Sequence, residues 1–188
     1  MRLSTHVLPW IISRMSLDWR IKHGYAPHGR TGSESSPTIG GTVTIHTELT
    51  ARHIRDEEEL GRRTVWDRVV TNAGRDAVVD CFNNTFEAEN FNWHDSGTGV
   101  VAEAVGDTAM GAAAGPARIS GTQSQPTSDV YRTVGTVTYT ATQAITEHGI
   151  FSAATVGTLL DRTVFAAINV VNGDKIEFTF NLTFASGG

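Results

Sequence analysis

Three stretches near the end of the sequence decide the fold: ITEHGIF (residues 145–151), LLDRTVFAAINVV (residues 159–171) and KIEFTFNLTF (residues 175–184). In the last of these every second residue is apolar, namely Ile176, Phe178, Phe180, Leu182 and Phe184. Because successive side chains of a strand point to opposite faces, this alternation predicts a strand with one buried and one polar face. The pattern stops four residues before the end of the sequence, so we expect this strand to close a β core.

Length and composition restrict the class of protein without indicating a function. At 188 residues the chain fits one domain, which would bury roughly 70% of the surface that its unfolded chain exposes. The single cysteine, Cys81, excludes an internal disulfide and a multi-cysteine zinc site, and its apolar neighbours predict a buried structural thiol. No apolar run approaches the ~20 residues of a membrane helix, and HVLPWII near the start is too short for a signal peptide. We therefore expect a protein that is neither exported nor embedded in a membrane.

Charge is distributed unevenly along the sequence. Residues 1–40 carry five Arg/Lys and two Asp/Glu, which gives +3, so residues 41–188 must carry −8 to reach the net charge of −5. Arginine also outnumbers lysine 13 to 2. Because a guanidinium keeps its charge and donates several fixed hydrogen bonds, this excess favours desolvated contacts between subunits, although a GC-rich coding bias would produce it equally well.

The first forty residues predict an extended N-terminal arm. Their large apolar side chains gather around Trp10 and Trp19, and the following stretch, GYAPHGRTGSESSPTIGG (residues 24–41), consists of turn and coil formers. Aromatic anchors on a coil tether have too little apolar surface to fold alone, so we expect the arm to dock on a neighbouring chain. Its predicted interface residues are Trp10, Ile11, Ile12, Arg14, Trp19 and Arg20.

Other interpretations of the arm stay open. It could form a strand and a short helix packed on its own domain, or Met15 could be the true start of the protein. A membrane anchor fits less well, because the aliphatic stripe is short and is interrupted by Pro9.

Residues 41–188 are expected to form a single β-rich domain that opens with a hairpin. VTIHTELTARHI (residues 43–54) alternates like a strand, RDEEELGRR (residues 55–63) predicts a long charged turn, and RTVWDRVV (residues 63–70) predicts the returning strand. The acidic cluster from Asp56 to Glu59 lacks the ligand spacing of a calcium loop, so we predict no metal site there.

One helix is expected in this domain, over about residues 72–84. Thr71 or Asn72 can cap it, and Ala73, Ala77 and Cys81 recur at helical spacing. The alanine-rich stretch at residues 99–121 contains Gly115 and Pro116 and predicts a loop, whereas YRTVGTVTYTAT (residues 131–142) predicts a strand.

Two short motifs imitate catalytic or nucleotide-binding sites. Residues 97–102, GTGVVA, match a dinucleotide fingerprint, but no long helix is expected after them and no acid follows about 20 residues on. Residues 95–98, DSGT, resemble the catalytic loop of aspartic proteases, which needs two such loops, and the chain has one copy. A homodimer could supply the second copy, but we expect Asp95 to cap or turn a loop.

The remaining polar residues do not predict catalysis. The seven histidines show no metal-ligand spacing, and His46 and His53 fall on opposite faces of a predicted strand. His94 adjoins Asp95 and His148 follows Glu147, so a catalytic triad would arise only by chance in three dimensions. An acidic body and scattered arm cations also disfavour binding to nucleic acid.

Several strings together resemble a known group of proteins. They are VVTNAGRDAVVDCF (residues 69–82), GTGVVAEAVGDTAM (97–110), VYRTVGTVTYTATQAITEHGIF (130–151), LLDRTVF (159–165) and NLTFASGG (181–188). In combination they resemble tailed-bacteriophage virion proteins of the small capsid decoration (cement) or tail-appendage type, over about residues 65–188. The resemblance implies a β-sandwich or jelly-roll-like module without enzyme activity.

These observations lead to one combined expectation. We expect a mainly β protein, an antiparallel β-sandwich or jelly-roll-like domain with one short helix and an N-terminal arm, that forms a homo-oligomer without cofactors or metals. As a capsid decoration protein it would be made in the host cytoplasm, bind the major capsid protein on the particle surface and stabilise the shell. The alternative is a tail, baseplate or fibre component, including a receptor-binding appendage, that binds tail proteins. Strand order, the number of subunits and the surface that the arm contacts do not follow from the sequence.

Overall fold

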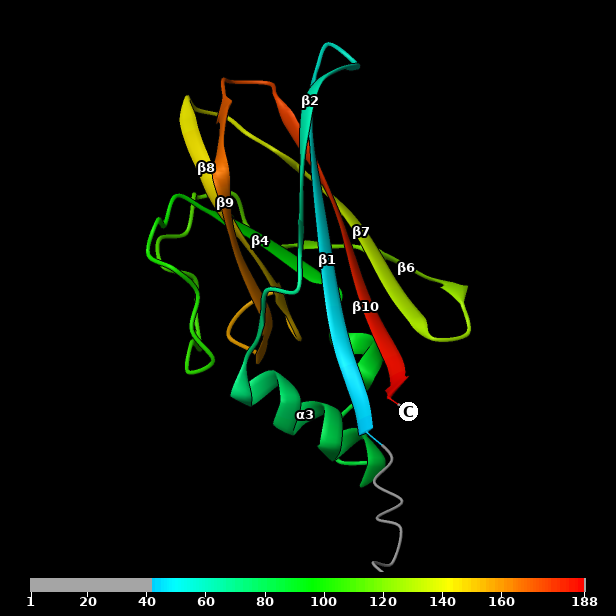
Figure 1. Cartoon of the computed structure of the whole chain (residues 1–188). Helices are drawn as coiled ribbons and strands as arrows, with labels where there is room; N and C mark the ends of the chain where they lie inside the picture. The colour runs from blue at the N-terminus through cyan, green and yellow to red at the C-terminus, as the bar shows by residue number, and fades with distance from the viewer. Residues whose placement is uncertain (1–41, 188) are drawn as a thin grey trace, which may run out of the picture. The chain divides into compact units, whose positions relative to one another are not determined.

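Two five-stranded antiparallel sheets form the body of the protein (Figure 1). The computed structural model describes residues 42–187. The first sheet contains, in spatial order, β2 (Glu58–Trp66), β1 (Thr42–Arg55), β10 (Lys175–Gly187), β7 (Val130–Thr138) and β6 (Thr122–Thr127). The second contains β3 (Val69–Val70), β9 (Leu159–Val170), β8 (Gln143–Phe151), β4 (Trp93–Gly97) and β5 (Ile119–Ser120). The mainly β sandwich predicted from the sequence is therefore confirmed.

The C-terminal strand β10 supplies the centre of the core, as its alternation predicts. Ile176, Phe178 and Phe180 are completely buried, and Leu182 is nearly so. Phe184 is 37% exposed because it lies past the end of the core, next to the groove described below. The strand also continues to Gly187, beyond the predicted end at Phe184, because it pairs with the first residues of β1.

The β1–β2 hairpin differs from the prediction in its turn. Only Asp56 and Glu57 lie between the two strands, and both have positive φ angles, of 49° and 64°. Positive φ at both central residues is the conformation of tight two-residue hairpin turns, whose twist matches that of the strands. The predicted long turn at residues 55–63 is therefore wrong, because most of its charged residues belong to β2.

The predicted returning strand at residues 63–70 is split between the two sheets. It breaks at Asp67, which has a φ angle of 50° and donates its N–H to the Thr47 carbonyl at 2.7 Å. After this turn Val69 and Val70 pair with β9 in the second sheet. The segment thus joins the two layers of the sandwich.

The predicted helix is confirmed as α3 (Asn72–Phe82). The Thr71 hydroxyl accepts the N–H of Gly74 at 2.9 Å, which is the N-cap contact expected for threonine. Gly74 packs so closely on β9 that an added Cβ would lie 2.6 Å from the Leu160 backbone. Cys81 near the end of α3 is only half-buried, so the fully buried thiol predicted from its neighbours is not found.

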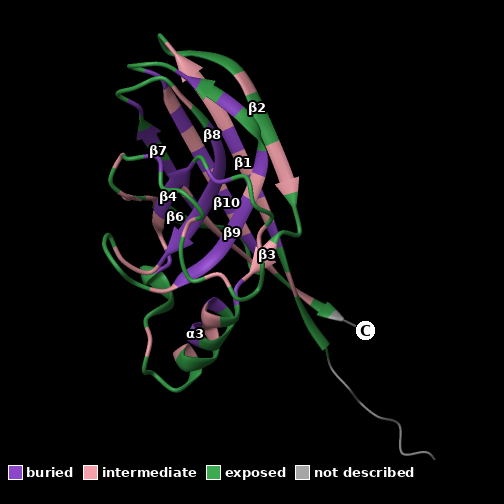
Figure 2. Ribbon diagram, turned by 90° about the vertical axis from the view of Figure 1, so that its left-hand side faces the viewer, coloured by how far each residue is buried: buried purple, intermediate pink, exposed green. Residues whose placement is uncertain are grey.

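Residues 145–151 of β8 and 159–163 of β9 are buried on both faces of the sheet, which was not predicted from the sequence. Figure 2 shows long runs of buried residues in both strands, and every residue from Ile145 to Phe151 is buried. One face packs on the first sheet, and the irregular loop at residues 98–118 covers the other. The loop contains no helix, as predicted from Gly115 and Pro116.

Residues 1–41 and Gly188 lie outside the described residues. The predicted arm (residues 1–40), its interface residues and the alternative start at Met15 all fall within that part of the chain. Between residues 42 and 187, no helix is long and apolar enough to cross a membrane.

Candidate functional site

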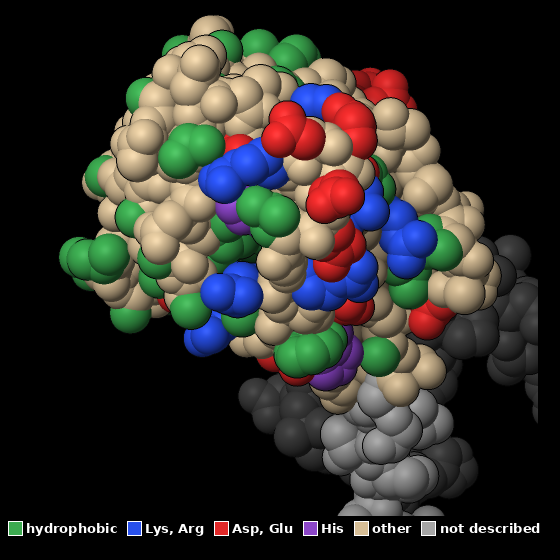
Figure 3. Space-filling model, turned by 90° about the horizontal axis from the view of Figure 1, so that it is seen from above, with side chains coloured by type: hydrophobic (Ala, Val, Ile, Leu, Met, Phe, Trp, Pro, Cys, Tyr) green, Lys and Arg blue, Asp and Glu red, His purple; other side chains and the backbone are tan. Residues whose placement is uncertain are grey.

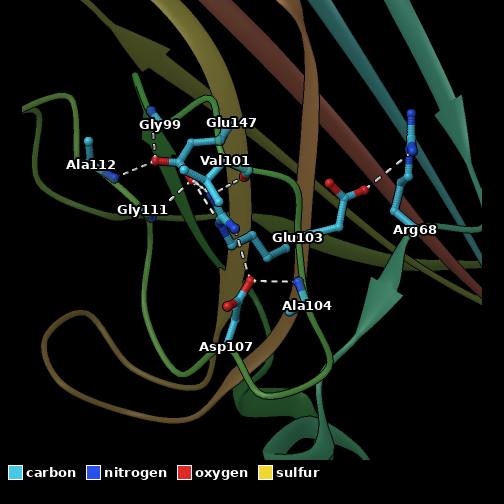
Figure 4. A network of polar contacts seen from close by, with 10 residues as sticks. Arg68, Gly99, Val101, Glu103, Ala104, Asp107, Gly111, Ala112 and Glu147 are labelled. Atoms are coloured by element: carbon cyan, nitrogen blue, oxygen red, sulfur yellow. Dashed lines mark hydrogen bonds and ion pairs between the residues drawn. The ribbon is translucent and has the colours of Figure 1, made fainter.

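A buried ionic network fastens the 98–118 loop to the second sheet (Figure 4). The Glu147 carboxylate, on β8, accepts the N–H groups of Gly99 at 3.0 Å, Gly111 at 3.0 Å and Ala112 at 2.7 Å. It also lies 2.7 Å from the guanidinium of Arg162, on β9. Both carboxylate oxygens therefore receive two donors each, and the side chain is completely inaccessible to solvent.

Arg162 extends this network along the loop. Its guanidinium donates to Asp107 at 2.9 Å and to the Val101 carbonyl at 3.1 Å. The Asp107 carboxylate in turn accepts the Ala104 N–H at 2.9 Å, which closes a small turn within the loop. One buried guanidinium thus fixes the loop at several points.

The protonation state of Glu147 follows from these contacts. Burial alone would raise the pKa of its carboxyl group, but the N–H donors of Ala112 and Gly111 and the charge of Arg162 together hold that pKa below its ordinary value. The group is therefore ionised and saturated with donors. This arrangement suits a structural anchor better than a proton-transferring group.

A second polar cluster lies between the two sheets and was not predicted from the sequence. His94 on β4 and His148 on β8 are fully buried, and their Nδ1 and Nε2 atoms share a hydrogen bond of 3.0 Å. His94 also contacts the Thr133 hydroxyl at 3.0 Å, and the ring of His148 stacks 4.4 Å from that of Phe178. Burial lowers the pKa of His94 to about 3 and that of His148 well below its ordinary value, so both rings are neutral.

The protease-like motif DSGT lies mostly in a strand rather than in a loop. Asp95 is a residue of β4 and is 8% exposed, so the expectation that it caps or turns a loop is wrong. Its carboxylate pairs with Arg118 at 3.0 Å, and that guanidinium lies 3.3 Å over the Phe151 ring. Ser96 accepts a hydrogen bond from Tyr139 at 2.9 Å. The motif is thus built into a packed sheet, with its carboxylate already paired.

The acidic cluster predicted at the hairpin takes part in ion pairs. Glu57 contacts Lys175 at 2.6 Å, and Glu59 contacts Arg62 at 2.8 Å. Figure 3 shows Lys/Arg and Asp/Glu side chains interspersed at this end of the body. Among residues 42–187, no cluster of three or more His, Cys, Asp or Glu side chains has the arrangement of a metal site.

An apolar groove of about 750 Å³ opens between α3 and the first sheet. Its apolar lining comes from α3, from the segment after it and from β7 and β10, and includes Val78, Phe82, Phe91, Tyr131, Leu182 and Phe184. Phe82 is 87% exposed, so a large aromatic side chain stands free at the groove. Exposed aromatic groups beside an apolar depression are typical of protein interaction sites.

The border of the groove is acidic. Glu89 and Asp129 line it and are exposed, and Asp80 and Glu87 lie close enough that their charges, after burial, contribute to the raised pKa of the groove residue Cys81. Within the described part of the chain, these four carboxylates form no ion pair with Lys, Arg or His. Among residues 42–187, the groove therefore presents the negative charges of Glu89 and Asp129 around an apolar floor.

The structure joins some of the residues singled out from the sequence and separates others. His94 and His148 meet, whereas His46 pairs with Asp67 and His53 with Asp174, at different places on β1. The Glu147–Arg162 pair was missed, although two charged residues within otherwise apolar strands are a signal for it. The six predicted arm residues lie outside the described part.

Comparison with known proteins finds no relative: no family model, curated protein or solved structure matches this chain. Over residues 42–187 the fold defines the class as a two-sheet antiparallel β-sandwich, with the α-helix α3 and an apolar groove beside it.

Proposed function

We propose that this chain is a structural protein of a tailed-bacteriophage virion, namely a capsid decoration protein that binds and stabilises the capsid shell. One observation carries the proposal. The sequence strings that resemble such virion proteins meet in a single network, in which Gly99 belongs to GTGVVAEAVGDTAM, Glu147 to ITEHGIF and Arg162 to LLDRTVF. Strings that are far apart in the sequence thus contribute to one network of contacts. This supports the interpretation that the strings form a single sequence pattern.

The buried carboxylates also support a structural rather than a catalytic role. Glu147 and Asp95 are each paired with an arginine. A group that must exchange protons with a substrate needs access and a pKa near the working pH. In this protein both groups instead hold loops and strands in place.

The negative body and the positive N-terminal segment support attachment by the arm. Residues 1–40 carry +3 and contain Trp10 and Trp19, whereas the remainder carries −8. Buried aromatic side chains supply most of the affinity in protein interfaces, and charged residues around them set orientation and association rate. The arm would therefore contact capsid subunits or neighbouring copies of this chain.

The proposal can be tested by sedimenting the protein with capsids that lack it. We expect the full chain to sediment with the capsids, and the double variant Trp10→Ala/Trp19→Ala to remain in the supernatant while its circular dichroism spectrum is unchanged. A chain lacking residues 1–40 should fold and also fail to bind. If this truncated chain bound as tightly as the full chain, attachment by the arm would be excluded.

A further inference from the structure

We propose that the groove beside α3 receives the segment Trp10–Lys22 of a second copy of this chain. This inference rests on the proposed function, because a capsid decoration protein has many neighbouring copies of its own chain.

The groove has the size and lining that a segment with aromatic anchors requires. Its volume of about 750 Å³ lies within the range of pockets that enclose most of a bound ligand, so it can take more than one large side chain. Val78 and Tyr131 on its wall already pack on the core, which makes the wall rigid. Trp10, Ile11 and Trp19 are side chains suited to such a site.

The charges of the two parts are complementary. The segment WIISRMSLDWRIK (residues 10–22) contains Arg14, Arg20 and Lys22 against Asp18, which gives +2. The groove lining includes the carboxylates of Glu89 and Asp129, and Asp80 and Glu87 are close enough to act on its residue Cys81. Apolar contact at the centre with opposite charges at the border is the usual construction of a specific protein interface.

The length of the connecting chain allows the segment to reach a second copy. Ile45 near the start of β1 pairs with Phe184, which lines the groove, so β1 begins close to the groove. Residues 23–41 are rich in Gly, Ser and Pro, and a coil of this length spans roughly 25 Å. A connection of this reach allows the segment to pass to an adjacent copy. Exchange of an identical segment between copies is a common route to oligomers.

The native cysteine offers a direct test, because Cys81 lines the groove and is the only cysteine in the chain. We would prepare full-length Ile12→Cys and Met15→Cys variants, oxidise them with copper phenanthroline, and separate them on a non-reducing denaturing gel. The expected result is a covalent species of two or more chains that disappears when Cys81→Ser is added. Ser35→Cys, in the connection, is the control and should cross-link at least fivefold less.

Two outcomes of this experiment would overturn the inference. A disulfide that forms within one chain, seen as a faster-migrating monomer, would show that the segment occupies its own groove. Equal cross-linking of Ser35→Cys, or none in any variant, would show that the segment does not occupy the groove at all.

A second measurement does not depend on cross-linking. Phe82→Glu removes the exposed aromatic side chain from the groove, whereas Val79→Glu adds the same charge at an exposed position of α3 that does not line it. In analytical ultracentrifugation we expect Phe82→Glu to weaken self-association at least tenfold and Val79→Glu to leave it unchanged. Identical behaviour of the two variants would contradict the inference.

Both experiments use purified protein without capsids, so this inference and the proposed function can fail separately. Loss of self-association in Phe82→Glu with capsid binding intact supports both proposals. Capsid binding by a chain that fails the cross-linking test leaves the proposed function standing and overturns only the groove assignment.

Discussion

Glu147 and Arg162 are 15 residues apart in the sequence, and their side chains meet 2.7 Å apart beneath the 98–118 loop, almost completely shielded from solvent. They lie on neighbouring strands, β8 and β9, and the residues directly before and after each of them in its strand are buried. A charge pair in such a place gives little net stability by itself, but removing one partner leaves the other charge buried and unpaired. We therefore expect the 98–118 loop to lose its attachment to the second sheet when either partner is removed.

Arg162→Ala should destabilise the protein by about 3–5 kcal/mol, because the Glu147 carboxylate would keep its charge without a cation. Urea unfolding followed by circular dichroism measures this loss. Arg62→Ala is the matched control, since its pair with Glu59 is exposed to solvent and should contribute little to stability. Equal losses in the two variants would contradict the anchoring role.

Glu147→Gln tests the same site without changing its size. Each carboxylate oxygen of Glu147 accepts from two donors, so either orientation of the amide would place an NH₂ group against N–H or guanidinium donors. We expect a loss of about 2 kcal/mol or more and faster hydrogen exchange at Gly99 and Ala112. Unchanged exchange at both amides would argue against the network.

Asp161 should make stability depend on pH. It is completely buried, the Thr163 hydroxyl donates to one of its oxygens at 2.8 Å, and burial together with the charge of Glu103 raises its pKa to about 7. The folded state therefore binds a proton more tightly than the unfolded state, so this residue's contribution to stability falls as pH rises from about 4 to about 7. The slope is at most about 1.4 kcal/mol per pH unit.

The variant Asp161→Asn isolates this effect, because the amide does not titrate. As pH rises from 4 to 7, we expect the unfolding free energy of the variant to increase relative to that of the wild type. Above pH 7 the difference between the two should stay constant. A difference that does not vary with pH would mean that Asp161 has an ordinary pKa.

His94 and His148 should give the opposite trend in acid. Burial holds the pKa of both rings below the unfolded value of about 6.5, to about 3 for His94, so their contribution is complete above pH 6.5 and is lost as pH falls toward 3. NMR titration of the imidazole resonances measures this directly. We expect neither ring to titrate between pH 5 and pH 8, and a midpoint near 6.5 for either ring would contradict its burial.

Gly74→Ala should destabilise the protein although alanine favours helices. The added Cβ would lie 2.6 Å from the Leu160 backbone, which cannot move without disturbing β9. We expect a net loss of about 1–3 kcal/mol in urea unfolding. Gly106→Ala is the control, because nothing lies within 4 Å of its added Cβ. A gain in stability at Gly74, as helix propensity alone would give, would rule out the close packing of α3 on β9.

The sequence predicts those elements whose signals are local. The alternation from Ile176 to Phe184 predicts β10, and Thr71 with the apolar spacing after it predicts α3. Burial of β8 and β9 on both faces could not be predicted, because it depends on a loop that reaches them from elsewhere in the sequence. The His94–His148 pair could not be predicted for the same reason, because its members are 54 residues apart. The groove could not be predicted either, because its lining comes from α3, β7 and β10 together. The hairpin turn was misplaced because Asp56 and Glu57 adopt positive φ angles that non-glycine residues rarely take.

The central proposal, that this chain is a capsid decoration protein, is tested most directly by counting its copies in purified virions of a phage whose genome carries its gene. Quantitative mass spectrometry with isotope-labelled reference peptides gives the ratio of this chain to the major capsid protein. We predict a copy number comparable to that of the major capsid protein. Absence of the chain from the particle would contradict the account, and a small number set by rotational symmetry, such as three, six or twelve, would place the chain in the tail instead.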